Sequence, residues 1–341
     1  MRIEYFDQAK GFAIFLMVFA HAIAWNYGDW QSVCVYHNGQ EYPEIIGGLL
    51  WNVIYAFHMP LFFLVAGYFT PPHTQNTRLS WEECYKLLYK RTKRLLIPYL
   101  TTGFIIYFVR GHWGYWFFLS LWQLSIIGCV FTLICQMMNK KYSLTIDILI
   151  AGILYFILFT VQSRVEFEDT YDVFKFESYM PPYIIGIILS RHKKTFDMII
   201  SSNNVYMFSF VCFISLFATM YFDQSWSVAM QKILYFMRYY ILPILGSIIC
   251  LSLFYSNHQN VVCKMLGKIG KRTSEIYVLH ILFVIQVPMV GEFILCQQPF
   301  TSITLQIVIF SVFSAIAIGL SIVFSMPLKK SKLLNSLLFG Y

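Results

Sequence analysis

The sequence predicts an all-α integral membrane protein, a single transmembrane domain over residues 1–341 built as a bundle of about ten transmembrane helices. Three observations lead to this prediction: few charged residues, many long apolar segments, and an uneven distribution of Lys and Arg between the loops. Of the 341 residues, 58% are hydrophobic and 12% are charged, about half the charged share of an ordinary soluble domain. This composition excludes a soluble enzyme, a disordered chain and a nucleic-acid binder, and it makes membrane lipids the expected surroundings.

The apolar segments are numerous enough for ten spans. A helix needs roughly 20 mainly apolar residues to cross the hydrocarbon core. The third and sixth candidates are the weakest, because the third is short and contains Pro98 and the sixth opens with two prolines. Polar and apolar residues do not alternate as they would in an outer-membrane barrel, so a helical bundle is predicted. The ten candidates are residues 8–27, 45–69, 95–109, 114–138, 144–162, 179–190, 203–222, 234–255, 274–296 and 302–327.

The loop charges set the predicted orientation. Most of the 25 Lys and Arg residues fall in connections on one side of the bundle, including the basic runs 90–94, 191–194 and 329–332. The longest connections on the other side, 28–44 and 163–178, hold few of them. Because Lys and Arg concentrate in cytoplasmic loops, both termini are predicted to be cytoplasmic. The chain is then a multi-pass protein of the cell membrane, the inner membrane in a bacterium.

The first predicted span carries ionisable groups that are costly in a bilayer. Lys10 and His21 are eleven residues apart, three helical turns with about 20° left over, and Asp7 lies on the same stripe. Such groups cost on the order of 2.5–3.5 kcal/mol on insertion scales and mark functional sites by default. An imidazole suits proton transfer near neutral pH, which makes His21 a candidate catalytic base. The plainer interpretation is that Lys10 reaches the headgroups and His21 hydrogen-bonds a neighbouring helix.

Two further histidines fall inside predicted spans. His58 lies two residues before Pro60, which frees a backbone carbonyl one turn earlier, so an unwound turn is expected beside His58. In the ninth span, Tyr277 and His280 are three residues apart and share a face, and Glu275 lies in the first turn of that helix. Each of these side chains is a candidate for contacting or supporting a substrate. The alternative for each is a packed residue whose hydrogen bonds are satisfied locally.

The basic run at 90–94 ends a predicted cytoplasmic loop. Arg91 and Arg94, at i and i+3 of a helix, could grip phosphates with two planar guanidinium groups, although anchoring to anionic lipid is the simpler interpretation. His192 and Asp197 match the His-x4-Asp pattern of glycerolipid acyltransferases, but a basic loop produces this pattern by chance. There is no GxSxG, GxxxxGK or HExxH motif. The cysteines show no ligand spacing, so no metal site is expected.

Taken in order, these segments resemble the acyltransferase-3 family of integral membrane O-acyltransferases. The segments that carry the resemblance are Lys10-x10-His21 within FDQAKGFAIFLMVFAHA, then FHMPLFFLVAGYF, KRTKRLLIPY, WGYWFFLSL and LGKIGKRTSEIYVLH. The chain is similar to stand-alone sugar O-acetyltransferases of the fucose 4-O-acetylase type. One departure is Ala66, where the family commonly has a serine before the glycine, so a role for that hydroxyl is in doubt in this chain.

The resemblance implies a reaction and roles for the residues. An acyl group, most often acetyl, would move from cytoplasmic acyl-CoA to a hydroxyl of a cell-surface or lipid-linked glycan, with acyl-CoA as donor substrate and no permanently bound cofactor. Arg91 and Arg94 would bind the CoA phosphates. His21 would act as general base or carry the acyl group, while Lys10, oriented by Asp7, would interact with the donor or balance developing charge.

Two other functions fit the same composition. A transporter or flippase for a glycan or lipid intermediate would suit a bundle with intramembrane histidines, but internal repeats with paired broken helices are typical of transporters. No convincing repeat is present in the sequence. A non-catalytic partner in a glycan-assembly complex is the other alternative, and it leaves the Lys10 and His21 stripe without a purpose.

Overall fold

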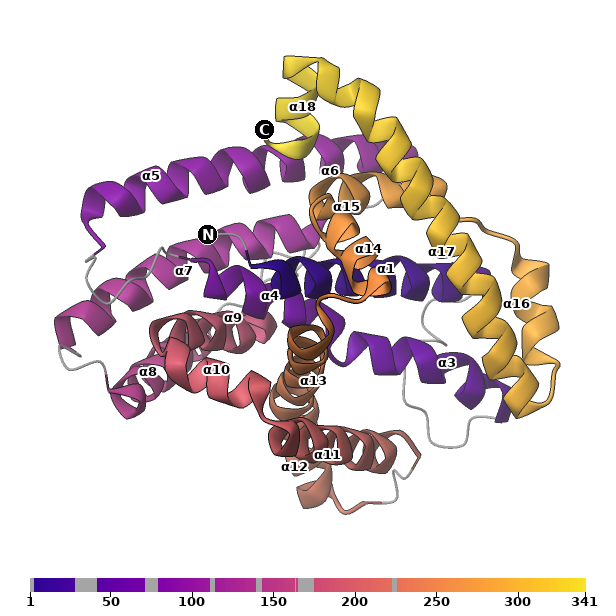
Figure 1. Ribbon diagram of the computed structural model, residues 1–341, viewed down its shortest axis with the longest axis horizontal. Helices are drawn as coiled ribbons and strands as arrows, with labels where there is room; N and C mark the ends of the chain where they lie inside the picture. Colours follow the sequence, from indigo (N-terminus) through magenta and orange to yellow (C-terminus); the bar gives the residue numbers. More distant parts are fainter. Residues whose placement is uncertain are drawn as a thin grey trace. The chain divides into compact units, whose positions relative to one another are not determined.

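The computed structural model describes residues 3–27, 42–70, 79–110, 114–138, 143–162, 164, 175–222 and 226–341. Within these ranges the regular structure is helical and no strand occurs (Figure 1). The prediction of an all-α protein is therefore confirmed. Most of the two long connections expected on the outer side, 28–44 and 163–178, lies outside the described residues.

The described residues form helices and two π-helical turns. In chain order they are α1 (Glu4–Asn26), α3 (Tyr42–Tyr55), α4 (His58–Tyr68), α5 (Trp81–Arg91), the π-helical turn η1 (Thr92–Leu96), α6 (Ile97–Arg110), α7 (Trp116–Met138), α8 (Leu144–Gln162), α9 (Phe176–Arg191), α10 (Lys193–Ser201), α11 (Asn203–Phe222), α12 (Val228–Phe236), the π-helical turn η3 (Met237–Ile241), α13 (Leu242–Asn257), α14 (Val261–Gly270), α15 (Thr273–Phe283), α16 (Pro288–Leu295), α17 (Pro299–Lys330) and α18 (Lys332–Phe339).

The described helices make this a multi-pass membrane protein. Two bent helix pairs add to the six long apolar helices: Lys193–Ser201 with Asn203–Thr219, bent by 72°, and Thr273–Phe283 with Pro288–Leu295, bent by 89°. The described residues thus contain six spans, or up to eight if each bent pair is one span. The six long apolar helices are Glu4–Asn26, Gly48–Tyr68, Trp116–Met138, Leu144–Gln162, Val228–Asn257 and Pro299–Lys330.

The two weakest predicted spans account for the difference from ten. Candidate 95–109 falls mostly in α6, which has 14 residues, and candidate 179–190 falls in α9, which has 16. At 1.5 Å per residue these helices are about 21 and 24 Å long, shorter than the hydrocarbon core of about 30 Å. The count of ten spans is therefore not confirmed. The cytoplasmic position of both termini stays a prediction.

The chain forms two compact units. This division is based on packing alone, so the single functional domain over residues 1–341 stays a prediction. The first unit comprises residues 1–61 and 200–326, and the second comprises residues 62–199 and 327–341. In the first unit α1 packs along α14 (Figure 1). A Cβ atom added to Gly270 would clash with the carbonyl of Asp7, and one added to Gly11 would clash with the carbonyl of Leu266. Two glycines therefore set how closely these helices approach.

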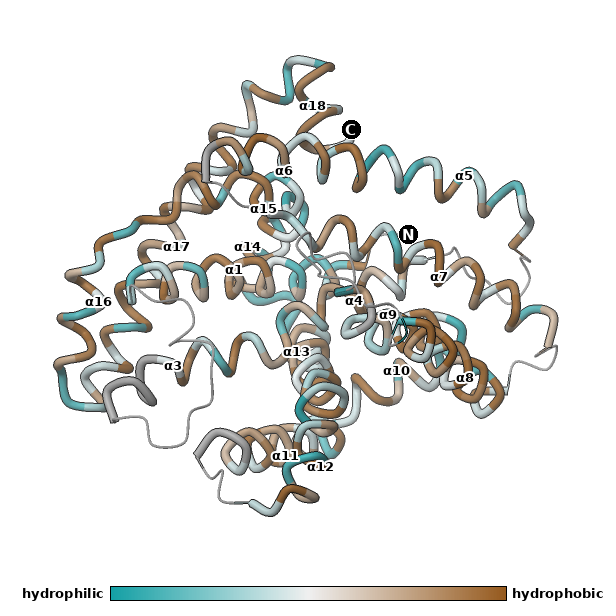
Figure 2. Tube along the Cα trace, turned by 180° about the vertical axis from the view of Figure 1, so that it is seen from behind, coloured by the Kyte–Doolittle hydropathy of each residue, from teal (hydrophilic) through white to brown (hydrophobic). Residues whose placement is uncertain are grey.

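Glycines also bring helices together in the second unit. A Cβ atom on Gly67 would clash with the carbonyl of Tyr183 in α9, and one on Gly186 would clash with the carbonyl of Leu64. These two glycines therefore allow α4 and α9 to approach closely. Helix α8 of this unit is hydrophobic over most of its surface, whereas α5 is mainly hydrophilic (Figure 2). This contrast is what a lipid-facing span and a charged connecting helix require.

Gly270→Val is expected to force α1 and α14 apart, because the clash is with backbone and not with a flexible side chain. Overpacking of this kind costs about 1–3 kcal/mol, so the Tm in detergent should fall by several degrees. Gly152→Val is the matched control, since a Cβ there meets nothing within 4 Å. Equal Tm values for the two variants would contradict this account of the α1–α14 contact.

Candidate functional site

His21 of α1 and His280 of α15 meet side chain to side chain in the first unit. Nδ1 of His21 and Nε2 of His280 are 2.9 Å apart, and the ring centroids are 5.1 Å apart. His280 is fully buried and His21 is half-buried. Both were predicted to lie inside spans, but their contact joins positions 259 residues apart, which no local pattern could indicate.

Backbone carbonyls determine which nitrogen of each ring carries the proton. Nδ1 of His280 lies 2.8 Å from the carbonyl oxygen of Tyr277 and 3.1 Å from that of Ile276, so this nitrogen must donate. In a neutral imidazole the other nitrogen then accepts, and Nδ1–H of His21 is its donor. The hydrogen-bond network therefore assigns the lone pair of His21 to Nε2, which is the atom that can take a proton.

Trp25 restricts the orientation of the same imidazole. Its ring is stacked with that of His21, with centroids 5.7 Å apart and planes within 5° of parallel. Trp25 is four residues after His21, so the two share a helix face. The hydrogen bond to His280 and this aromatic contact together hold the ring plane of His21, so that Nε2 keeps one direction.

His58 is a third histidine of the first unit. It begins α4 directly after a break in the helix at residues 56–57, which confirms the unwound turn predicted from Pro60. Its Nδ1 donates to the carbonyl of Ile54 at 2.8 Å, the side chain is fully buried, and Nε2 has no hydrogen-bond partner. A second imidazole lone pair is thus present in the interior of the first unit.

The break between α15 and α16 is held by Asn26, which the sequence analysis missed. Asn26 Nδ2 donates to the carbonyl of Ile285 at 2.9 Å, and its Oδ1 accepts from the N–H of Val287 at 2.6 Å. These backbone groups lie outside any helix and would otherwise be unsatisfied in an apolar region. An amide side chain near the end of an apolar span was the available signal. Asn26 ties the helix that carries His280 to the helix that carries His21.

The N-terminal half of the predicted stripe is also paired. Lys10 Nζ and Asp7 Oδ1 are 2.7 Å apart, with Asp7 nearly buried and Lys10 partly exposed. At 1.5 Å per residue, Lys10 lies about 16 Å along α1 from His21, so it does not reach the histidine pair. Glu275 is buried in the first turn of α15, where the helix dipole favours a carboxylate. Tyr277 contributes its carbonyl to His280.

Arg91 and Arg94 point to different partners in the second unit. An Nη atom of Arg91 donates to Oγ1 of Thr70 at 2.6 Å, while the guanidinium of Arg94 lies 4.5 Å from the ring centre of Tyr341. The two side chains differ in direction because of the turn η1, which starts directly after Arg91 and contains Arg94. The wider π-helical turn rotates Arg94 away from the face that an α-helix would give it. The two guanidinium groups therefore have different partners, Thr70 and Tyr341, and joint phosphate binding by Arg91 and Arg94 stays a prediction.

The environment of the Arg91 guanidinium favours the binding of an anion. Burial lowers the pKa of Arg91, and the nearby positive charge of Arg94 acts in the same direction. Within the described residues, the ion pairs that form are elsewhere, at Asp7, Glu82 and Asp147. A half-buried guanidinium without a carboxylate partner would be stabilised by a bound phosphate. In the same described part of the chain, no group of three or more His, Cys, Asp or Glu residues is arranged to hold a metal ion.

A comparison with protein families decides the identity of the chain. The acyltransferase-3 model, described as an acyltransferase domain, matches residues 3–326, nearly the whole sequence. The chain belongs to the acyltransferase-3 family. No curated protein and no solved structure matches it. Family membership together with the apolar helices makes the protein a membrane acyltransferase, and the match includes every candidate residue described above.

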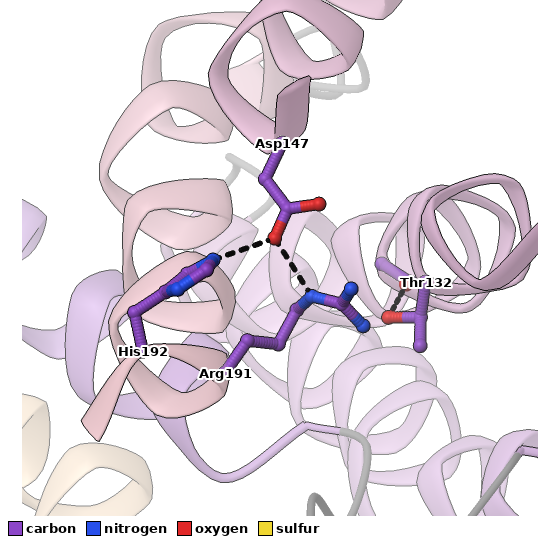
Figure 3. Close-up of polar contacts among 5 residues, drawn as sticks. Thr132, Asp147, Arg191 and His192 are labelled. Carbon is purple, nitrogen blue, oxygen red and sulfur yellow. Dashed lines mark hydrogen bonds and ion pairs between the residues drawn. The ribbon is translucent and has the colours of Figure 1, made fainter. Parts of the chain in front are cut away.

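The acyltransferase contains a second buried polar cluster that the sequence analysis missed. Oδ2 of Asp147 in α8 accepts hydrogen bonds from Arg191 Nε and His192 Nε2, both at 2.9 Å, and the outer end of the Arg191 guanidinium points toward Thr132 (Figure 3). His192 thus pairs with Asp147 and not with Asp197, which agrees with the interpretation of the His-x4-Asp pattern as chance. A lone acidic residue in the apolar run 144–162 was the available signal.

This cluster anchors a helix that has little other packing. Asp147 and Ile150 are the buried residues of α8, and the side chains of Asp147 and Arg191 are 0% and 2% exposed. Buried opposite charges must stay paired, because removal of one leaves the other uncompensated in a low-dielectric interior. The ion pair is therefore assigned to attaching α8 within the second unit, and not to the reaction.

Asp147→Asn in the acyltransferase is expected to cost about 3–5 kcal/mol, since Arg191 would remain charged and buried without a counter-ion. The expected observation is a much lower Tm in detergent. The double variant Asp147→Leu with Arg191→Met removes both charges and should recover most of that loss. If the double variant is no more stable than the single one, the ion pair is not what holds α8.

Proposed function

We propose that this acyltransferase moves an acyl group, most often acetyl, from cytoplasmic acyl-CoA to a hydroxyl of a cell-surface or lipid-linked glycan. The observation that carries the proposal is the His21–His280 pair with its defined tautomers. The family match supports acyl transfer, and the similarity to stand-alone sugar O-acetyltransferases supports a sugar hydroxyl as the acceptor. The basic, half-buried surroundings of Arg91 support a polyanionic donor such as CoA.

In the proposed reaction His21 is the general base. Nε2 of His21 takes the proton of the acceptor hydroxyl while the hydroxyl oxygen attacks the thioester carbonyl. The new C–O bond forms and the C–S bond breaks, and the proton passes from Nε2 to the leaving CoA sulfur. The atoms balance: one ester and one thiol replace one alcohol and one thioester. Direct attack by His21 to form an acyl-imidazole is the other form of the same hypothesis.

His280 has the role of an orienting partner in this scheme. Its Nε2 accepts from Nδ1–H of His21, and this bond becomes charge-assisted when His21 takes up the proton. The carbonyls of Tyr277 and Ile276 prevent His280 from rotating to the opposite tautomer. The arrangement resembles the use of a third group to orient the base in hydrolase triads, with an imidazole in the place of the carboxylate.

His58 and Lys10 are assigned supporting roles. A buried acceptor left without a donor costs about 1–3 kcal/mol, and a substrate hydroxyl at Nε2 of His58 would remove that cost, so we assign His58 to positioning the acceptor. Lys10, held by Asp7, is too far from His21 to touch the reacting carbonyl. We assign Lys10 to contact with the acyl-CoA donor. Glu275 and Tyr277 are assigned to supporting α15, the helix that carries His280.

His21→Ala is expected to abolish acyl transfer without preventing membrane insertion, because general-base catalysis alone contributes about 10²- to 10⁴-fold. The measurement is alkali-labile acyl groups on surface glycans in cells with the intact gene, no gene, or the variant at matched membrane levels. Normal ester content in the variant would remove His21 from the reaction.

His280→Ala is expected to lower kcat by on the order of 10²-fold, the lower end of a general-base contribution, with little change in KM for acyl-CoA. His280→Gln should recover part of kcat, because the amide can accept from His21 at the position of Nε2. Release of CoA thiol by purified protein measures both variants. Equal losses in the two variants, or a change confined to KM, would contradict the orienting role.

Transport of a glycan or lipid intermediate is a second candidate function, and the bent helix pairs favour it. Discontinuous helices near a binding site are typical of transporters, and two pairs here bend by 72° and 89°. A transporter would move its substrate without consuming the thioester. Thiol release from acyl-CoA by the purified protein therefore separates the two functions, and its absence with intact substrate movement would favour transport.

A further inference from the structure

Helix α5 of the second unit carries a row of exposed aromatic side chains. Trp81, Tyr85 and Tyr89 are 80%, 70% and 53% exposed, and their spacing of four residues places them on one face of the helix. The rings of Tyr85 and Tyr89 are stacked, with centroids 6.3 Å apart. A contiguous exposed patch of large rings marks a contact surface. These three residues are called the aromatic stripe of α5.

Charged side chains occupy a second exposed face of the same helix. Glu82, Lys86 and Lys90 are also four residues apart and exposed, and Nζ of Lys86 lies 2.6 Å from the carboxylate of Glu82. The aromatic stripe therefore lies between this charged face and the face that packs against the rest of the unit, an order typical of helices at a membrane surface. Helix α5 is nevertheless mainly hydrophilic (Figure 2), because Trp and Tyr rings each carry a polar group.

The packed face of α5 places this helix at the edge of the bilayer. Cys84 of α5 clusters with Cys129 of α7, and Leu133 of α7 packs against the same cluster. Helix α7 is one of the six long apolar helices and ends at Met138. At 1.5 Å per residue, Cys129 and Leu133 lie about 14 and 8 Å before that end. Helix α5 therefore lies beside the last turns of a spanning helix, where the headgroups begin.

The residues that follow α5 give the same indication. Helix α5, the turn η1 and α6 follow one another without a gap. On α6 the exposed side chains four residues apart are Leu100, Phe104 and Phe108, which suit the hydrocarbon core. Trp and Tyr, in contrast, are enriched at the level of the headgroups. A change from Trp and Tyr to Leu and Phe is therefore expected where a helical segment passes from the interface into the hydrocarbon.

We propose that the aromatic stripe of α5 is a lipid-contact surface at the headgroup level of the bilayer that the long helices cross. Its partner is the boundary between headgroups and acyl chains. The rings supply the contact area, while the indole N–H and the phenol O–H groups hydrogen-bond headgroups or water. The two exposed Glu and two exposed Lys residues of α5 balance each other, so zwitterionic lipid suffices. This inference does not depend on the acyl donor or the acceptor.

The test is tryptophan fluorescence of the full-length protein in phosphatidylcholine nanodiscs that hold one copy each. Because the chain has eight Trp residues, the signal of Trp81 is the difference between wild type and Trp81→Phe. Phosphatidylcholine brominated high in its acyl chains should quench this signal, and iodide in the water should quench it little. The control is Lys86→Trp in the Trp81→Phe background. Its introduced indole lies on the charged face, so iodide should quench it and the brominated lipid should not.

Hydrogen exchange of the backbone amides tests the whole stripe in the same nanodiscs. Replacement of all three stripe residues by Ser should raise the exchange rate of α5 several-fold and leave that of α7 unchanged, because only α5 loses its contact with lipid. The matched control is Glu82→Ser with Lys86→Ser and Lys90→Ser, at the same spacing on the charged face. This control loses more helix propensity, so a larger effect of the stripe variant must come from the lipid contact.

Four outcomes would overturn the proposal. Quenching of the Trp81 signal by iodide alone would place the stripe in water. Protection from both quenchers in single-copy discs would mean that the chain itself covers the stripe, and protection only in discs with two copies would mean that a second copy covers it. An equal rise in the exchange rate of α5 in the two triple variants would remove the role of the rings.

Discussion

Polar groups inside a bilayer have no water to bond, and this cost decides where the helices of the acyltransferase can break and which side chains can meet. The break between α15 and α16 exists because Asn26 bonds the freed groups of Ile285 and Val287. The buried Asp147 is tolerated because Arg191 and His192 bond it. The same requirement brings His21 and His280 together, since each imidazole satisfies the other.

The hydrogen bonds of His280 and His21 also determine which ring nitrogen can accept a proton. The carbonyls that bond His280 leave it a single tautomer, and this in turn assigns the lone pair of His21 to Nε2. A base whose proton-accepting atom is defined before substrate binds needs little reorganisation during the reaction. His58 is the exception, because its buried Nε2 has no partner. An unsatisfied buried acceptor in the same unit as a candidate base is the feature expected where a substrate supplies the missing donor.

In the second unit, local helix geometry determines which partners two arginine side chains contact. A single π-helical turn begins directly after Arg91 and contains Arg94, three residues later. The inner guanidinium is directed to Thr70 and the outer one to Tyr341. Glycines such as Gly67 and Gly186 bring the neighbouring helices into backbone contact, which leaves little freedom in that packing.

The sequence by itself determined the membrane class, the family, the stripe of Asp7, Lys10 and His21, and the unwound turn at His58. These follow from local rules: apolar length, helical spacing, and the hydrogen bond that Pro60 cannot make. It gave ten spans where the described helices support six to eight, because hydropathy does not report where a helix ends.

Only the tertiary structure decided which distant residues meet. Four features were absent from the sequence prediction: the contact of His21 with His280, the bonds of Asn26 across the broken helix, the Asp147 cluster, and the different partners of Arg91 and Arg94. The physical reason is that helical periodicity fixes which side chains share a face of one helix. Which faces then meet depends on packing between helices that are far apart in the chain.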